Sequence, residues 1–108
     1  MAVTILQYRT RAERADENQK LIERVFGELA VTRPAHLRYA SFRLADGVSF
    51  VHVADIDTDD GSNPLTATAA FVEFVREIGD RCEEGPEAAP ATLVGGYGFS
   101  PEGEASHG

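Results

Sequence analysis

The stretch from Arg38 to Ile56, RYASFRLADGVSFVHVADI, decides the fold of this chain. Two runs rich in β-branched and aromatic residues flank a single Ala45-Asp46-Gly47 break, which is the pattern of a β-hairpin. We therefore predict two antiparallel strands joined by a tight turn. The rest of the chain must supply the elements that cover the two faces of this hairpin.

Two registers of the hairpin are open, and a shift of one residue turns every side chain to the opposite face. In the first, Gly47 is a left-handed bulge residue after a type I turn, so that Phe42 opposes Phe50 and His52 joins them on the core face. We favour this register. A two-residue Asp46-Gly47 turn would instead gather a different set on one face: Tyr39, Ser41, Arg43, Phe50 and His52.

A strand and a helix are predicted before the hairpin. Residues 2–8 (AVTILQY) are β-branched and apolar, which indicates a central strand that is apolar on both faces. Apolar residues then recur at helical spacing up to about residue 30, which predicts an amphipathic helix. Its start is open, because Thr10 and Glu13 have the spacing of a capping box, whereas Asp16 would give a later start.

A second helix and a last strand are predicted after the hairpin. Asn63-Pro64 supplies a helix cap followed by proline at the first helical position. Apolar residues at spacings of three and four continue from there to Cys82, and Gly85-Pro86 ends the pattern. Residues 93–99 (LVGGYGF) predict a short strand, whose glycines leave room for a neighbouring backbone or a ligand.

The predicted order is therefore βαββαβ, which favours a ferredoxin-like α+β fold: a four-stranded antiparallel sheet with two helices on one face. We expect a single domain over residues 1–99 and a disordered tail over residues 100–108. Two helices cover one face only, yet the first strand is apolar on both. We expect a second copy of the chain to cover the open face, which gives a homodimer.

Composition excludes several classes of function. The 108 residues are 43% hydrophobic and 26% charged, which is ordinary for a globular domain. The net charge of −8 argues against nucleic-acid binding, because contact with phosphates requires a basic surface. No apolar run approaches the length of a membrane span, and no leader pattern precedes the first strand. We expect no membrane partner and a cytoplasmic location.

Metal and disulfide chemistry are not predicted. The acidic loop from Asp55 to Gly61 is similar to a calcium loop, but its glycine falls one place late, and Thr66 stands where a bidentate Glu is required. Cys82 is the single cysteine, so it forms no internal disulfide and is expected to be a buried structural thiol.

Three features together resemble one known family. They are the hairpin RYASFRLADGVSFVHV, the Asn63-Pro64-Leu65 helix start, and the FVEFV stretch before a GYGF strand. They resemble the antibiotic biosynthesis monooxygenase-like group, over about residues 3–99. The resemblance implies a dimeric α+β barrel with ligands between sheet and helices. The group includes cofactor-free monooxygenases of aromatic polyketides and haem-degrading enzymes, whose Trp-containing catalytic sets cannot be carried over because this chain has no Trp.

His52 is the candidate catalytic residue, because it projects from the middle of a strand onto the face that the helices cover. An imidazole there could transfer a proton to or from a phenolic substrate; the alternative is a structural histidine. Arg38 could hold an anionic or carbonyl group, or form a salt bridge near Asp55. Aromatic candidates for substrate binding could equally be plain core: Phe42, Phe50, Phe71, Phe74 and Tyr97.

The leading hypothesis is a homodimeric, cofactor-independent oxygenase that acts on a small aromatic or polyketide-like substrate, with His52 as proton shuttle. The competing hypothesis is a non-catalytic dimeric protein that binds a small molecule or takes part in an interaction. The sequence leaves open whether the protein is an enzyme.

Overall fold

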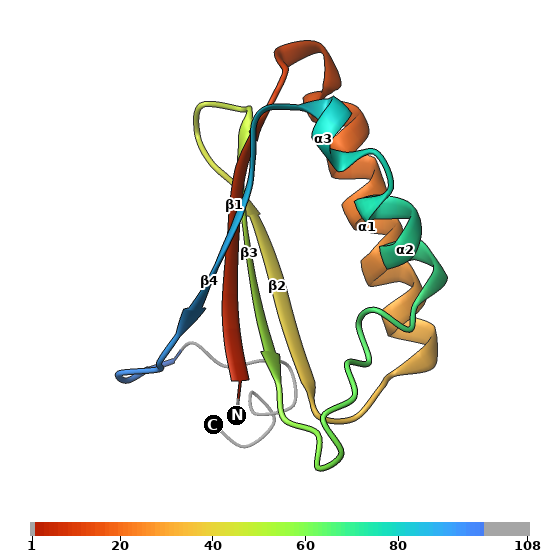
Figure 1. The fold of residues 1–108 in the computed structure, drawn as a ribbon, viewed down its shortest axis with the longest axis vertical. Coiled ribbons are helices and arrows are strands. Elements are labelled where there is room, and N and C mark those ends of the chain that lie inside the picture. The colour runs from red at the N-terminus through yellow and green to blue at the C-terminus, as the bar shows by residue number, and fades with distance from the viewer. Residues whose placement is uncertain (1, 99–108) are drawn as a thin grey trace.

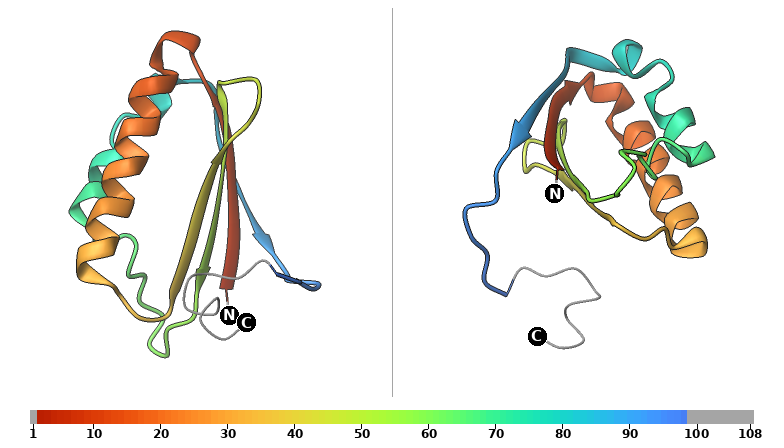
Figure 2. Two further views of the ribbon diagram at one scale, coloured as in Figure 1. Left: turned by 180° about the vertical axis from the view of Figure 1, so that it is seen from behind. Right: turned by 60° about the horizontal axis from the view of Figure 1, so that its bottom comes forward.

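Four antiparallel strands form one sheet in the computed structural model, which describes residues 2–98 (Figure 1). They are β1 (Ala2–Thr10), β2 (Leu37–Arg43), β3 (Ser49–Ile56) and β4 (Cys82–Ala91), in the order β2-β3-β1-β4. The helical elements are the short η1 (Ala12–Arg14), α1 (Ala15–Thr32), α2 (Ala69–Val75) and α3 (Ile78–Arg81). Figure 2 shows α1 and α2 on the same side of the sheet. The predicted ferredoxin-like α+β fold is confirmed, and the predicted tail over residues 100–108 lies outside the described residues.

β1 is a central strand, as its sequence predicts, with β3 on one side and β4 on the other. Its alternation places Leu6, Tyr8 and Thr10 toward the helices, and Val3 and Ile5 toward the open face of the sheet. The predicted capping box does not form, since the Thr10 hydroxyl donates to the carbonyl of Val48 at 3.3 Å. The later of the two predicted helix starts is the correct one.

The hairpin adopts the other register, so the one we favoured was wrong. Ser41 pairs with His52, and Phe42 pairs with Val51. Gly47 is left-handed (φ 80°) as expected, but the loop spans residues 45–48 and closes where the Leu44 amide donates to the carbonyl of Ser49. The cause is Asp46, whose Oδ1 accepts from the amides of both Val48 and Ser49 and so holds one more residue in the loop.

The end of the chain also differs from expectation. Asn63 caps a turn through its Oδ1, and α2 begins only after Thr68, whose hydroxyl accepts from the Phe71 amide. α2 ends at Val75, and a left-handed Glu77 (φ 61°) separates it from the short α3, so the predicted continuous helix up to Cys82 was wrong. The last strand runs from Cys82, and the segment over residues 93–98, predicted as a strand, leads away from the sheet (Figure 1). Phe99 lies outside the described residues.

β4 tolerates Pro86 and Pro90 because it lies at the edge of the sheet. On the outer side of an edge strand no neighbouring strand accepts hydrogen bonds, so a missing amide hydrogen there removes none. Sequence patterns treat Gly85-Pro86 as a stop, yet the free edge of β1 pairs with this segment, for example Ile5 with Ala89. Tertiary pairing therefore overrides the local signal.

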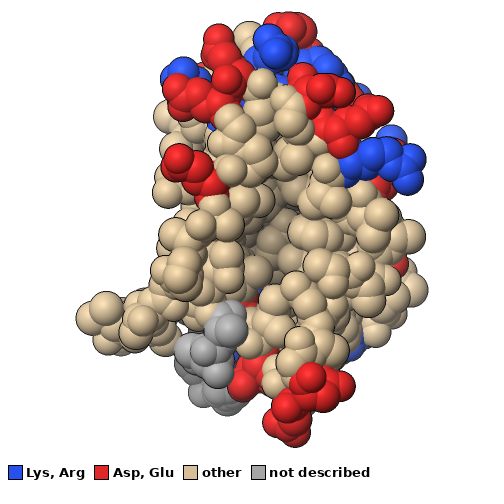
Figure 3. All heavy atoms as spheres, viewed as in Figure 1, with Lys and Arg blue, Asp and Glu red and all other residues tan. Residues whose placement is uncertain are grey.

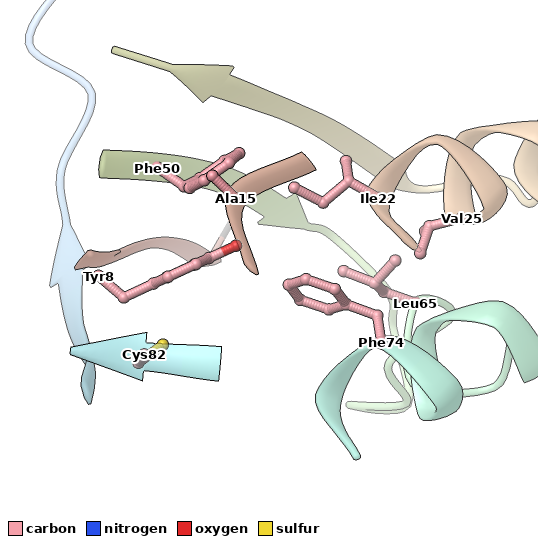
Figure 4. Packing of buried hydrophobic residues seen from close by; sticks show 8 residues of the cluster. All are labelled: Tyr8, Ala15, Ile22, Val25, Phe50, Leu65, Phe74 and Cys82. Atoms are coloured by element: carbon pink, nitrogen blue, oxygen red, sulfur yellow. The ribbon is translucent and has the colours of Figure 1, made fainter. Parts of the chain in front are cut away.

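The hydrophobic core lies between the sheet and the helices. Figure 4 shows Phe74 pointing from α2 toward Tyr8 of β1, with Ile22 and Val25 of α1 close by. Val25 and Phe74 are fully buried, and Cys82 is buried as predicted. None of the helices described within residues 2–98 combines the length and the apolar character that crossing a membrane requires.

Candidate functional site

His52 lies in the middle of β3, and its imidazole is surrounded by hydroxyl groups. Nε2 is 2.8 Å from the hydroxyl of Tyr8, and Nδ1 is 2.7 Å from that of Tyr39 and 2.8 Å from that of Ser41. The residue is 3% exposed. Both ring nitrogens therefore have a hydrogen-bond partner within the protein.

The strand register assembles this cluster. Ser41 lies directly opposite His52 on β2, Tyr39 lies two residues along the same face, and Tyr8 projects beside them from β1. The rings of Tyr8 and Tyr39 pack against the imidazole with centroid distances of 5.4 and 5.8 Å. In the register we favoured from sequence, Ala40 and Phe42 would have occupied this face, and the cluster could not form.

Two further polar side chains extend the cluster into the helical layer. Asn18 of α1 donates from Nδ2 to the Tyr8 hydroxyl at 2.8 Å, and Arg81 of α3 donates from Nε to Asn18 Oδ1 at 3.0 Å. Arg81 also donates to the carbonyls of Phe74 and Arg76. Asn18 is 0% exposed and Arg81 is 2% exposed.

Sequence reasoning missed Tyr8, Asn18 and Arg81. One signal was available, because Asn18 stands one helical turn before Ile22 on the buried face of α1, where a polar residue requires a hydrogen-bond partner. Nothing in the sequence pairs Asn18 with Arg81, which lies 63 positions further along the chain.

Burial keeps His52 and the two tyrosines uncharged near neutral pH. It lowers the pKa of His52 to about 4, because an imidazolium would lose its hydration there. Burial raises the pKa of Tyr39 to about 12, against the opposing effect of a hydrogen bond with Ser41. It also raises the pKa of Tyr8, against the opposing effect of the hydrogen bond with Asn18. A neutral imidazole between two neutral phenols can accept a proton at one nitrogen and donate one at the other.

Three of the aromatic candidates meet beside this cluster. Phe74 packs on His52 with a centroid distance of 5.3 Å and on Phe71 at 5.9 Å, while Phe50 stacks on Tyr8 at 5.5 Å. Phe50 and Phe74 are almost completely buried, so both contribute to the core. Their role in binding a substrate stays a prediction.

Three other candidates do not join His52. Phe42 lies on the open face of the sheet and is 43% exposed, so its predicted place on the core face was wrong. Arg38 shares that open face, and its Nη1 is 4.0 Å from Oδ2 of Asp55, which is the salt bridge of the alternative prediction. Tyr97 is fully exposed and has no part in the cluster.

The surface is hollowed between the strands and the helices. Figure 3 shows this hollow lined by uncharged residues, with acidic and basic side chains gathered at the two ends of the molecule. A concave surface without charged side chains is compatible with a small-molecule site.

Comparison with known proteins finds likeness in structure only. No protein-family model matches the chain, and no curated protein matches its sequence. A solved structure described as an antibiotic biosynthesis monooxygenase superposes with a TM-score of 0.70 at 19% identity, covering 88% of this chain and 100% of that one.

Two further solved structures are similar. The Mycobacterium tuberculosis protein Rv0793 matches with a TM-score of 0.68 at 12% identity, over 88% of this chain and 96% of its own. SnoaB, a cofactor-independent oxygenase from Streptomyces nogalater, matches with a TM-score of 0.64 at 15% identity, over 90% of this chain and 96% of its own. At such identities the likeness concerns architecture alone. The chain therefore has the antibiotic biosynthesis monooxygenase-like fold.

Proposed function

We propose that this protein is a cofactor-independent oxygenase that acts on a small aromatic or polyketide-like substrate. The observation that carries the proposal is the buried, neutral His52 with Tyr8 on one nitrogen and Tyr39 and Ser41 on the other. The hollow between sheet and helices supports it, as does a fold shared with SnoaB. Oxygen can react directly with an electron-rich substrate anion, so the protein's task is to manage protons and exclude water.

His52 manages protons through its neighbours and not by direct contact with the substrate. Its ring is enclosed, whereas Tyr39 is half-buried, so the Tyr39 hydroxyl is the group that would meet a substrate oxygen. Phe71 packs edge-on against the Tyr39 ring, with centroids 6.4 Å apart, and would form an apolar wall beside that hydroxyl. This arrangement suits a flat aromatic molecule that carries a phenolic or enolic oxygen.

The His52→Asn variant is expected to lose oxygen uptake with anthrone or a quinol by about 10²-fold to 10⁴-fold, the usual contribution of a positioned proton-transfer group. Measurement of dissolved oxygen checks this. His36→Asn is the matched control, because His36 lies on an exposed loop and Asn tolerates its left-handed backbone (φ 63°). Uptake by wild type and by the control should be equal.

Full oxygen uptake by a folded His52→Asn variant would overturn the catalytic role of His52. Absence of uptake by the wild type, with anthrone still bound, would instead favour a non-catalytic small-molecule-binding protein. A specific observation favours that second function: both imidazole nitrogens already have partners within the protein, as in a structural histidine.

We also propose a homodimer formed through the open face of the sheet. No described helix covers this face, and it carries apolar side chains from three strands: Val3, Ile5, Ala40, Phe42, Val51 and Val53. An exposed apolar face of this kind favours a self-complementary contact with a second copy. We place the protein in the cytoplasm, where the free, buried thiol of Cys82 would stay reduced.

The Phe42→Glu variant is expected to shift the protein from a dimer to a single chain, because a carboxylate on the open face would be buried without a partner. Light scattering gives the mass directly, with 11.7 kDa as the value for one chain. Val72→Glu is the control, because Val72 is 48% exposed on α2, outside the sheet face. A wild type that already has the mass of one chain would refute the dimer.

A further inference from the structure

A row of hydrogen bonds runs from Arg81 through Asn18, Tyr8 and His52 to Tyr39. We propose that every donor in this row points the same way, so that Tyr39 presents its hydroxyl hydrogen to an anionic oxygen of the substrate. Arg81 and Asn18 are then positioning residues that fix this direction. The inference rests on the proposed function and deepens it, because it names the substrate class: aromatic or polyketide-like molecules that bind as a phenolate or an enolate.

The direction is set at Arg81. A guanidinium group can only donate, so the Asn18 atom 3.0 Å from Arg81 Nε must be the carbonyl oxygen of the amide. The carbonyls of Phe74 and Arg76 hold the guanidinium from the other side. The amide of Asn18 therefore cannot turn over, and its NH2 group faces Tyr8.

The direction then passes to His52. The Tyr8 oxygen accepts from Asn18 at 2.8 Å, so its own hydrogen is left for His52 Nε2, also at 2.8 Å. Among the described residues, Nε2 is the acceptor that this hydrogen can reach, and in that role it carries no proton. A neutral imidazole has one proton, which accordingly lies on Nδ1. In this tautomer His52 is a donor toward β2.

The hydroxyl hydrogen of Tyr39 is the end of the row. Nδ1–H of His52 points at the oxygens of Tyr39 and Ser41, and both must act as acceptors from it. Tyr39 cannot donate back to a protonated nitrogen. Its hydrogen bond with Ser41 lowers the pKa of Tyr39, which assigns the donor role in that bond to Ser41 and leaves the Tyr39 hydrogen available for a ligand. Tyr39 is half-buried, whereas the other members of the row are buried, so Tyr39 is the member that a ligand would reach.

The charge at the other end favours an anion as that ligand. Arg81 is 2% exposed and, among the described residues, its hydrogen bonds go to neutral acceptors. The carboxylate of Glu17, whose pKa the charge of Arg81 helps to lower, is exposed and screened by water, so it offsets that charge only in part. A positive charge within a low-dielectric core acts over longer distances than in water. A hydrogen bond to an ionised oxygen is also about twice as strong as one to a neutral oxygen. The row therefore selects the ionised form of a phenolic or enolic substrate.

The tautomer of His52 provides a test that needs no substrate. Nitrogen NMR of the protein labelled with ¹⁵N-histidine should show an unprotonated Nε2 and a protonated Nδ1. Asn18→Asp keeps the shape of the side chain and its bond with Arg81, but a carboxylate only accepts, so Tyr8 must donate to it. His52 should then switch to the Nε2–H tautomer.

Arg81→Met should release the Asn18 amide and give a mixture of both tautomers. Arg76→Met is the matched control, because the Arg76 side chain is 64% exposed and only its carbonyl contacts Arg81. A wild type with Nε2–H, or an unchanged tautomer in folded Asn18→Asp, would overturn the inference. If Arg81→Met does not fold, the Asn18→Asp result decides alone.

Binding of β-naphthol tests the substrate class. The wild type should bind the naphtholate, seen by its absorbance, and should lower the apparent pKa of the bound ligand. Tyr39→Phe should weaken naphtholate binding by about 10-fold to 100-fold, as for the loss of a hydrogen bond to a charged group. The affinity for the methyl ether of β-naphthol, which cannot ionise, should not change.

If Tyr39→Phe weakens the binding of naphtholate and of the methyl ether equally, or if the wild type binds neutral naphthol, the proposal that the ligand binds as an anion is refuted. These outcomes are separate from those of the oxygen assay. If the protein shows the expected tautomer and binds naphtholate but takes up no oxygen, the proposal of a directed row of hydrogen bonds stands and the proposed oxygenase activity is refuted.

Discussion

Phe74→Ala is expected to lower the free energy of unfolding by about 3–5 kcal/mol, the usual cost of emptying a fully buried aromatic site. Phe74 is 0% exposed and lies where the sheet, α1 and α2 meet. Its ring contacts the rings of His52 and Phe71, and the guanidinium carbon of Arg81 lies 5.3 Å from its centroid. The cavity would therefore open beside the polar row as well as within the core.

Urea denaturation followed by circular dichroism measures this loss. Val72→Ala is the control in the same helix, since Val72 is 48% exposed and its truncation removes little buried surface. We expect the control to cost less than about 1 kcal/mol, as is usual for an exposed position. Equal losses in the two variants would show that Phe74 is not packed as described.

Stability is expected to fall by about 3 kcal/mol between pH 6.5 and pH 4 because of His52 alone. In the unfolded chain the imidazole takes up a proton near its ordinary pKa of 6.5, whereas in the folded protein it does so only at about 4. Between these values the unfolded state binds more protons, so acid favours unfolding. Above this range the contribution is fully present, and below it the loss levels off.

The difference between wild type and His52→Asn isolates this effect, because carboxylates titrate in both proteins. Urea midpoints measured from pH 7 to pH 4 should converge as the wild type loses the contribution of neutral His52. Parallel curves over this range would contradict the low pKa of the buried imidazole.

The layout of the fold could be predicted because it follows from patterns within single segments. Three patterns each indicated the correct element. They are the apolar character of β1, the helical spacing of apolar residues in α1, and the two β-rich runs of the hairpin. The order βαββαβ then left few arrangements of one sheet and its helices.

The pairing of segments could not be predicted in the same way. The hairpin register depends on the Asp46 carboxylate, which accepts from two amides and so adds one residue to the loop. β4 has an acidic, proline-containing sequence with no strand signal, and it forms because β1 has a free edge. Both outcomes depend on three-dimensional contacts that local propensity does not contain.

The candidate site was half predictable for the same reason. His52 could be found as a polar residue in the middle of an apolar strand, although the face on which it lies depended on the register. Its partners could not, because Tyr39 and Ser41 depend on the register, and Asn18 and Arg81 come from separate helices.

The prolines of β4 bear on how copies of this protein can meet. A strand at the border of a sheet is a template on which a strand of another molecule can add, and such growth leads to aggregates. Pro86 and Pro90 remove two amide donors from β4, and Glu83, Glu84 and Glu87 add negative charge along it. Recruitment of a further strand at this border is therefore disfavoured, so the proposed contact between two copies through the face of the sheet meets no competition from the β4 edge.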